Sequence, residues 1–131
     1  MKLFVYVAIG AAIGGVARLA LSGFVQQRAG ADFPAGTLVV NLTGSFLLGV
    51  LIRYALQSAS VSPEMRALLT TGLCGGYTTF STFSYESAVL LQDGEYGRAG
   101  LYVAVSVFGA LLATFAGFAC AEWLLHLRAR V

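Results

Sequence analysis

The sequence predicts an all-α membrane protein with four membrane-spanning helices, the third of which is interrupted by a break. The first observation behind this prediction is composition. The 131-residue chain is 58% hydrophobic and only 11% charged, whereas a soluble domain carries about 25% charged residues. The second observation is that the charges are grouped. Four stretches contain no Asp, Glu, Lys or Arg: 3–17, 33–52, 67–85 and 99–121.

A helix needs roughly 20 apolar residues to cross a bilayer. The last three uncharged stretches reach that length by themselves, and the first does so when Arg18 is taken as a charge within or near the membrane. We therefore expect a single integral membrane domain over residues 1–131, in contact with the lipid bilayer, with no room for a soluble domain. The expected helices cover residues 3–25, 36–57, 66–92 and 98–125.

The first expected helix has a face of small residues. Gly10 and Gly14 lie four residues apart, and small residues at this spacing let membrane helices approach closely. A similar face in the fourth helix contains Gly109 and Gly117. We expect these faces to bring membrane helices into close contact. Arg18 continues the first face, and its guanidinium either reaches the membrane surface along its apolar stem or faces an aqueous vestibule and attracts anions.

The second expected helix has one polar face. Asn41, Ser45 and Gly49 recur every four residues among valine and leucine. An amide at membrane depth is costly unless it finds a hydrogen-bond partner, and this leaves two interpretations of Asn41. Its side chain can join two helices, or its NH₂ group can donate to an anion in a pore while its oxygen is bonded by protein.

The third expected helix contains the most informative segment of the chain, residues 72–84. Gly75 and Gly76 are followed by a run of hydroxyl residues, Thr78, Thr79, Ser81, Thr82 and Ser84. Irregular backbone at membrane depth persists only inside protein or beside a wet cavity, and broken membrane helices present their freed backbone groups to ions. We therefore predict a break in this helix that faces an ion.

Two phenylalanines alternate with the hydroxyl residues of this segment. Phe80 and Phe83 share one face if the helix resumes near Thr79, because residues three apart are neighbours on a helix. Such rings usually pack, but the surrounding hydroxyls favour a pore lining. Glu86 follows on the same helix, and an ionisable residue within a membrane is a candidate functional group unless it reaches the hydrated interface.

The fourth expected helix has hydroxyl residues beside its small-residue face. Tyr102, Ser106, Ala110 and Thr114 recur every four residues, so that one stripe of the helix has three hydroxyls. These hydroxyls can bond to the carbonyl four residues earlier. Beside the third helix, they can instead form a polar track for an ion.

Three motifs resemble those of the Fluc/CrcB family of fluoride ion channels. They are Gly14-Gly15-x-x-Arg18, Gly36-Thr37-Leu38-x-Val40-Asn41-x-x-Gly44-Ser45-Phe46 and Gly75-Gly76-x-Thr78-Thr79-Phe80-Ser81-Thr82-Phe83-Ser84. Together with the length and the number of helices, the resemblance covers essentially the whole chain. The third motif is highly specific, whereas the first alone would mean little.

The resemblance implies a fluoride-selective channel, not an enzyme, that lowers cytoplasmic fluoride by passive export across the cell (inner) membrane. It also implies an antiparallel, dual-topology homodimer with two pores and a structural sodium ion (Na⁺) at its centre. We expect the small-residue faces around Gly10, Gly14, Gly109 and Gly117 to hold the two copies together. The main-chain carbonyls of Gly75 and Thr78 would bind the sodium ion. The residues expected along the fluoride path are Asn41, Phe80, Phe83, Ser81, Thr82, Tyr102, Ser106, Thr114 and Arg18. Ala110 is a departure, since some relatives have a hydroxyl there.

Other classes of protein fit the sequence less well. The net charge of +2 is too small to indicate a nucleic-acid partner. A small multidrug exporter of similar length carries a carboxylate in the middle of its first helix, where this chain has Arg18 and no acid. A structural subunit of a larger membrane complex would explain the small-residue faces, but not the glycines and hydroxyls of residues 72–84.

Overall fold

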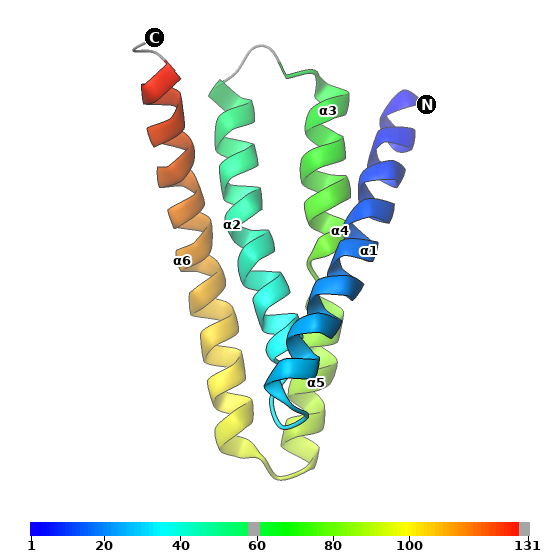
Figure 1. Cartoon of the computed structure of the whole chain (residues 1–131), viewed down its shortest axis with the longest axis vertical. Coiled ribbons are helices and arrows are strands. Elements are labelled where there is room, and N and C mark those ends of the chain that lie inside the picture. Colours follow the sequence, from blue (N-terminus) through cyan, green and yellow to red (C-terminus); the bar gives the residue numbers. More distant parts are fainter. Residues whose placement is uncertain (58–60, 129–131) are drawn as a thin grey trace.

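The computed structural model describes residues 1–57 and 61–128, and every regular element within these ranges is a helix. In chain order the elements are α1 (Lys2–Ala29), α2 (Ala35–Gln57), α3 (Pro63–Ala67), the π-helix η1 (Leu68–Cys74), α4 (Gly75–Tyr77), α5 (Phe80–Gln92) and α6 (Tyr96–Arg128). The helices run up and down, so that the start of α1 and the end of α6 lie at the same end of the bundle (Figure 1).

Three helices are long and apolar enough to cross a membrane, namely Lys2–Ala29, Ala35–Ala55 and Tyr96–Leu127. They correspond to the first, second and fourth expected helices. The third expected helix consists of α3, η1, α4 and α5, which follow one another along the bundle (Figure 1). The prediction of four helical segments with a break in the third is therefore confirmed.

Large apolar side chains cover the outside of the bundle. Phe4 on α1 is 78% exposed and Phe115 on α6 is 65% exposed. The largest fully buried side chains are those of Tyr102, Val40 and Cys74. A helix that is apolar all round is typical of a membrane span, so this surface belongs to a multi-pass membrane protein.

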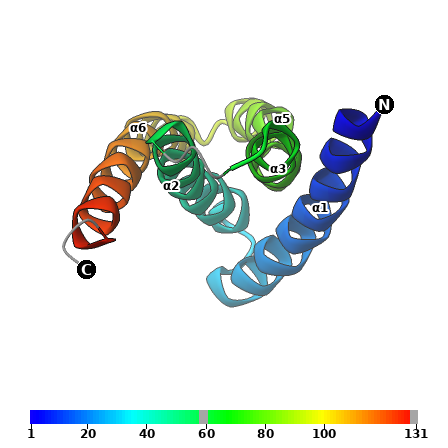
Figure 2. The same ribbon diagram turned by 90° about the horizontal axis from the view of Figure 1, so that it is seen from above.

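Two close helix packings form the bundle. Helix α2 packs along α6, while α1 crosses η1 and α4 on the other side (Figure 2). Glycines allow both approaches. A Cβ atom on Gly117 of α6 would meet the backbone of Phe46 and Val50 on α2, and a Cβ atom on Gly14 of α1 would meet the backbone of Leu73.

These contacts show that the expected use of the small-residue faces is wrong. Gly10 and Gly14 pack against the third segment of their own chain, Gly117 packs against α2, and Gly109 faces the Leu42 side chain. Short connections keep the helices of one chain together, so these faces are already occupied within a single copy and are not free to join two.

The break in the third segment lies at Thr78 and Thr79, after the glycines rather than at them. Gly75 has helical dihedral angles (φ −64°, ψ −38°), whereas Thr78 (φ −83°, ψ 158°) and Thr79 (φ −149°, ψ 111°) are extended. Gly76 allows close packing instead, because a Cβ atom on it would meet the backbone of Ala11 on α1. A break within residues 72–84 is confirmed, and its position is corrected.

The π-helix before the break was not expected. In η1 (Leu68–Cys74) the chain is wound more widely than in an α-helix, since each carbonyl in a π-helix accepts from the amide five residues on. Such turns often occur next to functional sites. Here η1 also forms the surface on which α1 packs.

Candidate ion pathway

One side chain of α2 bonds both backbone groups of a residue in the break. Asn41 Oδ1 accepts a hydrogen bond from the Thr79 amide (2.8 Å), and Asn41 Nδ2 donates to the Thr79 carbonyl (3.1 Å). A side-chain amide has the donor and the acceptor needed for both bonds. Asn41 therefore joins two helical segments, which was the first of its two interpretations.

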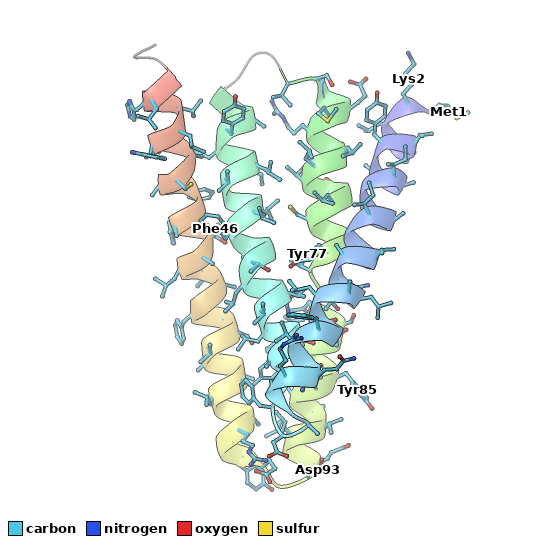
Figure 3. The ribbon with its side chains drawn as sticks, viewed as in Figure 1. Met1, Lys2, Phe46, Tyr77, Tyr85 and Asp93 are labelled. Atoms are coloured by element: carbon cyan, nitrogen blue, oxygen red, sulfur yellow. The ribbon has the colours of Figure 1, made fainter. Side chains whose placement is uncertain are left out.

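The backbone of α2 lies directly against the break. A Cβ atom on Gly44 would meet the Thr78 methyl group and the Tyr77 ring. The Tyr77 hydroxyl lies 2.9 Å from Thr43 Oγ1 of α2, and Figure 3 shows the Tyr77 side chain in the middle of the bundle between these elements. Contacts on both sides of Thr78 thus fix the position of the extended residues.

The break deprives two backbone carbonyls of their usual helical donors. In an α-helix the Gly75 oxygen would accept from the Thr79 amide, and the Thr78 oxygen from the Thr82 amide. The Thr79 amide donates to Asn41 instead, and the Thr82 amide donates to Thr79 Oγ1 (3.2 Å). Carbonyl oxygens freed in this way are suitable ligands for Na⁺, so the two expected sodium ligands fit that ion chemically.

Helix α5 begins at the break, inside the bundle. Thr79 is its N-cap: Thr79 Oγ1 accepts from the Thr82 amide and donates to Thr82 Oγ1 (2.9 Å). Ser81 Oγ lies 3.3 Å from the same oxygen, and the side chains of Ser81 and Thr82 are exposed. The N-terminus of a helix has a partial positive charge that attracts anions.

A hollow of about 290 Å³ lies on one side of the break and is named the phenylalanine hollow. Its walls include Asn41 and Ser45 of α2, Phe80 and Phe83 of α5, and Ser106 and Ala110 of α6. The ring centroids of Phe80 and Phe83 are 5.5 Å apart, and Phe80 is 79% exposed. Because the edge of an aromatic ring carries partial positive charge, these rings can contact an anion in the hollow.

Two buried residues of α6 have different roles at this hollow. Ser106 lines it, is only 8% exposed, and its Oγ has no hydrogen-bond partner within the described part of the chain. Tyr102 is fully buried behind Phe83, with ring centroids 5.3 Å apart. Its hydroxyl donates to Glu86 Oε2 (2.7 Å). Ser106 therefore faces the hollow, whereas Tyr102 supports its wall.

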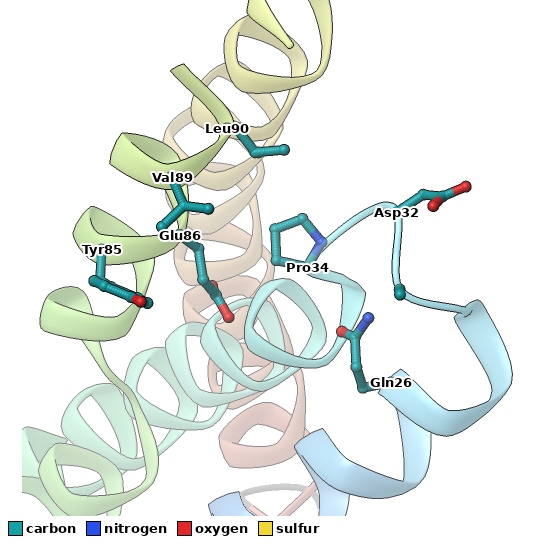
Figure 4. A pocket seen from close by; sticks show the side chains of 8 residues that line it. Gln26, Asp32, Pro34, Tyr85, Glu86, Val89 and Leu90 are labelled. Carbon is teal, nitrogen blue, oxygen red and sulfur yellow. The ribbon is translucent and has the colours of Figure 1, made fainter. Parts of the chain in front are cut away.

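Glu86 connects three helices. Its two carboxylate oxygens accept from Thr37 Oγ1 of α2 (2.8 Å) and from the Tyr102 hydroxyl of α6. The same side chain lines a pocket of about 270 Å³ near the connection between α1 and α2. Figure 4 shows Glu86 on α5 facing Pro34 and Gln26 across this pocket. The carboxylate is thus bonded by protein while remaining partly exposed.

A second hollow, of about 400 Å³, lies on the α1 side of the break and is named the arginine hollow. Arg18, Thr82 and Thr79 are among the residues that line it. The Arg18 guanidinium makes no hydrogen bond or ion pair with the described residues, and its side chain is half-buried. Since Thr79 lines both hollows, the break separates a hollow with a cation from a hollow with aromatic rings.

The structure does not bring Thr114 into either hollow. Its hydroxyl bonds to the Ala110 carbonyl (2.9 Å) and, more weakly, to the Ser45 carbonyl (3.5 Å). The first bond is the one by which a hydroxyl on a helix finds its partner within the same helix, at the carbonyl four residues earlier. Conversely, Thr79 and Ser45 line the hollows but were absent from the expected path. Ser45 could have been predicted from the sequence, because it lies one helical turn after Asn41 on the same face of the helix.

Comparisons with known proteins agree with these motifs. The family model described as CrcB-like protein, Camphor Resistance (CrcB) matches residues 5–118. A fluoride-specific ion channel FluC from Geobacter sulfurreducens is 47% identical over 95% of this chain and 100% of its own length. Relatives with the same name from Rhizobium meliloti and Anaeromyxobacter sp. (strain K) are 45% and 40% identical, over 91% and 95% of this chain and 95% and 98% of their own lengths. The chain therefore belongs to the CrcB-like family.

Proposed function

We propose that this protein is a fluoride-selective ion channel, and not an enzyme, that lets fluoride leave the cell passively across its inner membrane. Relatives at 40–47% identity over nearly their whole length bear the name fluoride-specific ion channel. The observation that carries the proposal in this chain is the phenylalanine hollow at the helix break, which is lined by two aromatic rings and by a buried Ser106 hydroxyl that has no partner among the described residues.

The chemistry of this hollow suits fluoride. Fluoride is small and strongly hydrated, so a selective pore has to replace its water with hydrogen-bond donors. Hydroxyls, an amide and ring edges can replace this water without carrying a net charge, so that they bind the anion less tightly than a ring of Lys or Arg would and let it leave again. Arg18 lies in the other hollow, where it can attract the anion toward the break without holding it among the rings.

We further propose that two antiparallel copies form the channel, with a structural sodium ion between them. Gly75 is exposed, and a Cβ atom on it would find no atom closer than 3.9 Å, so a second copy has room to approach its carbonyl. Two carbonyls from each copy, those of Gly75 and Thr78, would give the cation four oxygen ligands. The sodium ion would then fix the two breaks relative to each other. Dual insertion would follow from this arrangement, since antiparallel copies need both orientations.

Fluoride flux from liposomes that contain only this protein tests the channel. We expect the liposomes to release fluoride within seconds to minutes of an electrical shunt being added, and to retain chloride under the same gradient. Protein-free liposomes are the control. Retention of both ions would contradict the proposed function, and release of both at similar rates would contradict fluoride selectivity.

The dimer and its cation need separate measurements. The mass of the detergent-solubilised protein, measured by light scattering after size exclusion, should be that of two chains. Exhaustive exchange of Na⁺ for a large organic cation should lower the flux, and restoring Na⁺ should recover it. A monomer that conducts, or flux independent of Na⁺, would contradict this part of the proposal alone.

A further inference from the structure

The polar groups around the phenylalanine hollow differ in whether they are free to bind an ion. Asn41 uses its oxygen and one of its two Nδ2 hydrogens on Thr79, and the Thr79 hydroxyl donates to Thr82. The Thr78 hydroxyl donates to the Cys74 carbonyl (3.0 Å). Most polar side chains that line the hollow therefore already have protein partners.

Two hydroxyls in the same hollow are uncommitted. Ser106 Oγ is buried and has no partner within the described residues. The Ser45 hydroxyl likewise makes no hydrogen bond to any described residue, although its own carbonyl is bonded by Thr114. Burying the Ser106 hydroxyl without a partner is costly, whereas Ser45 is half-buried. Both residues line one space from different helices, Ser45 from α2 and Ser106 from α6.

The backbone that carries Ser45 is held firmly in place. It lies at a close contact between α2 and α6, because a Cβ atom on nearby Gly49 would meet the Thr114 carbonyl. The bond from Thr114 to the Ser45 carbonyl crosses the same contact. A donor on rigid backbone needs little reorganisation when an ion arrives, and preorganised donors stabilise charge most effectively.

We propose that Ser45 is a fluoride ligand, and that its hydroxyl and that of Ser106 bind the ion together in the phenylalanine hollow, one from α2 and the other from α6. This inference rests on the proposed function and adds a donor from α2 to the path. Fluoride accepts short, strong hydrogen bonds from hydroxyls, whereas chloride is larger and accepts weaker ones. A pair of hydroxyl donors therefore favours fluoride over chloride.

Flux measurements on Ser45 variants test the inference. Ser45→Ala should lower fluoride flux about tenfold or more, because a hydrogen bond to a charged group is lost. Ser45→Thr keeps the hydroxyl and should retain most of the flux. Ser87→Ala is the matched control: Ser87 is a buried serine whose hydroxyl bonds to the Phe83 carbonyl (2.7 Å) outside the hollow, and its loss should leave the flux near that of the wild type.

The outcomes separate this inference from the proposed function. Wild-type protein without fluoride flux would contradict the proposed function. If the wild type conducts fluoride and Ser45→Ala conducts it at the same rate, only the role of Ser45 is overturned. Size-exclusion profiles establish that each variant is assembled. If Ser45→Ala does not assemble, Ser45→Cys decides the matter, because it keeps the shape but has only a weak donor: reduced flux supports the inference, and wild-type flux overturns it.

Discussion

Asn41 compensates at a single residue for the hydrogen bonds that the break removes. Buried backbone amides and carbonyls need partners, and within a membrane no water is available to supply them. Both backbone groups of Thr79 are bonded by this one side chain. The extended conformation of the break is therefore stabilised from α2, and the geometry of the proposed ion sites depends on it.

A change of Asn41 should consequently affect stability as well as flux. Asn41→Asp keeps the acceptor for the Thr79 amide but loses the donor to the Thr79 carbonyl, and it can place a negative charge beside that oxygen. We expect a loss of about 1–3 kcal/mol in stability and little remaining fluoride flux. Thermal unfolding of the purified protein measures the first effect. An Asn41→Asp protein as stable as the wild type would contradict the bonding role.

Substitutions of the two phenylalanines should distinguish a role in fluoride flux from a role in packing. Phe80 is largely exposed and pairs with Phe83, whereas Phe83 pairs with both Phe80 and Tyr102. Phe80→Ile should therefore cost less stability than Phe83→Ile, since each aromatic pair contributes about 0.5–1.5 kcal/mol. Both should sharply reduce flux, because isoleucine is apolar but lacks the positive ring edge. Flux assays beside thermal unfolding check this. Normal flux in both variants would identify the rings as packing groups.

The sequence predicted which residues matter better than it predicted their partners. Asn41, Phe80, Phe83 and Ser106 do line one hollow, because helical spacing alone decides which residues share a face. The bond between Asn41 and Thr79 joins residues 38 positions apart, and no local pattern contains it. For the same reason the sequence could not show that the Thr114 hydroxyl would be bonded to backbone.

At the scale of elements, the three unbroken helices were predicted closely and the third segment only in outline. Long apolar stretches without charge predict the first and last residues of a membrane helix to within a few positions, as α1, α2 and α6 illustrate. The π-helix and the site of the break depend on how α1 and α2 pack against the third segment, through Gly14, Gly76 and Gly44. Such contacts arise only once the helices are assembled.

The packing of α1 on η1 gives an element-scale prediction. A Cβ atom on Gly14 would meet the backbone of Leu73 and Tyr77, whereas one on Gly15 would meet nothing within 4 Å. Gly14→Ala should therefore push α1 away from η1 at a cost of about 1–3 kcal/mol, and Gly15→Ala should not. Thermal unfolding of the two variants side by side measures the difference. Equal stability would contradict the close packing.

At the scale of the whole molecule, parts of the third segment lie open. Gly75 has free space around it, and farther along the segment Phe80 and Tyr85 are 79% and 71% exposed. Figure 3 shows Tyr85 projecting outward from α5. The open surface at Gly75, rather than the small-residue faces, is therefore available for the proposed second copy.

Gly75→Leu should leave each chain folded but prevent two copies from meeting. The added side chain enters open space within one chain, so helix content should be retained while the dimer and the fluoride flux are lost. Gly100→Leu is the control, because Gly100 is also exposed on a helix with nothing within 4 Å of an added Cβ atom. Circular dichroism, light scattering and flux measure the three properties. A conducting dimer of Gly75→Leu would place the interface elsewhere.

The glycine contacts also govern which mutations can be rescued by a second one. At Gly10, Gly14 and Gly117 an added methyl group meets backbone atoms of the facing helix. Backbone cannot be trimmed by mutation, so a genetic selection for suppressors should find no compensating change at the contact itself. At Gly109 the obstacle is the Leu42 side chain, which a second substitution can shorten. In a randomised library, Gly109 should thus covary with position 42, while the other three positions remain glycine whatever their neighbours become.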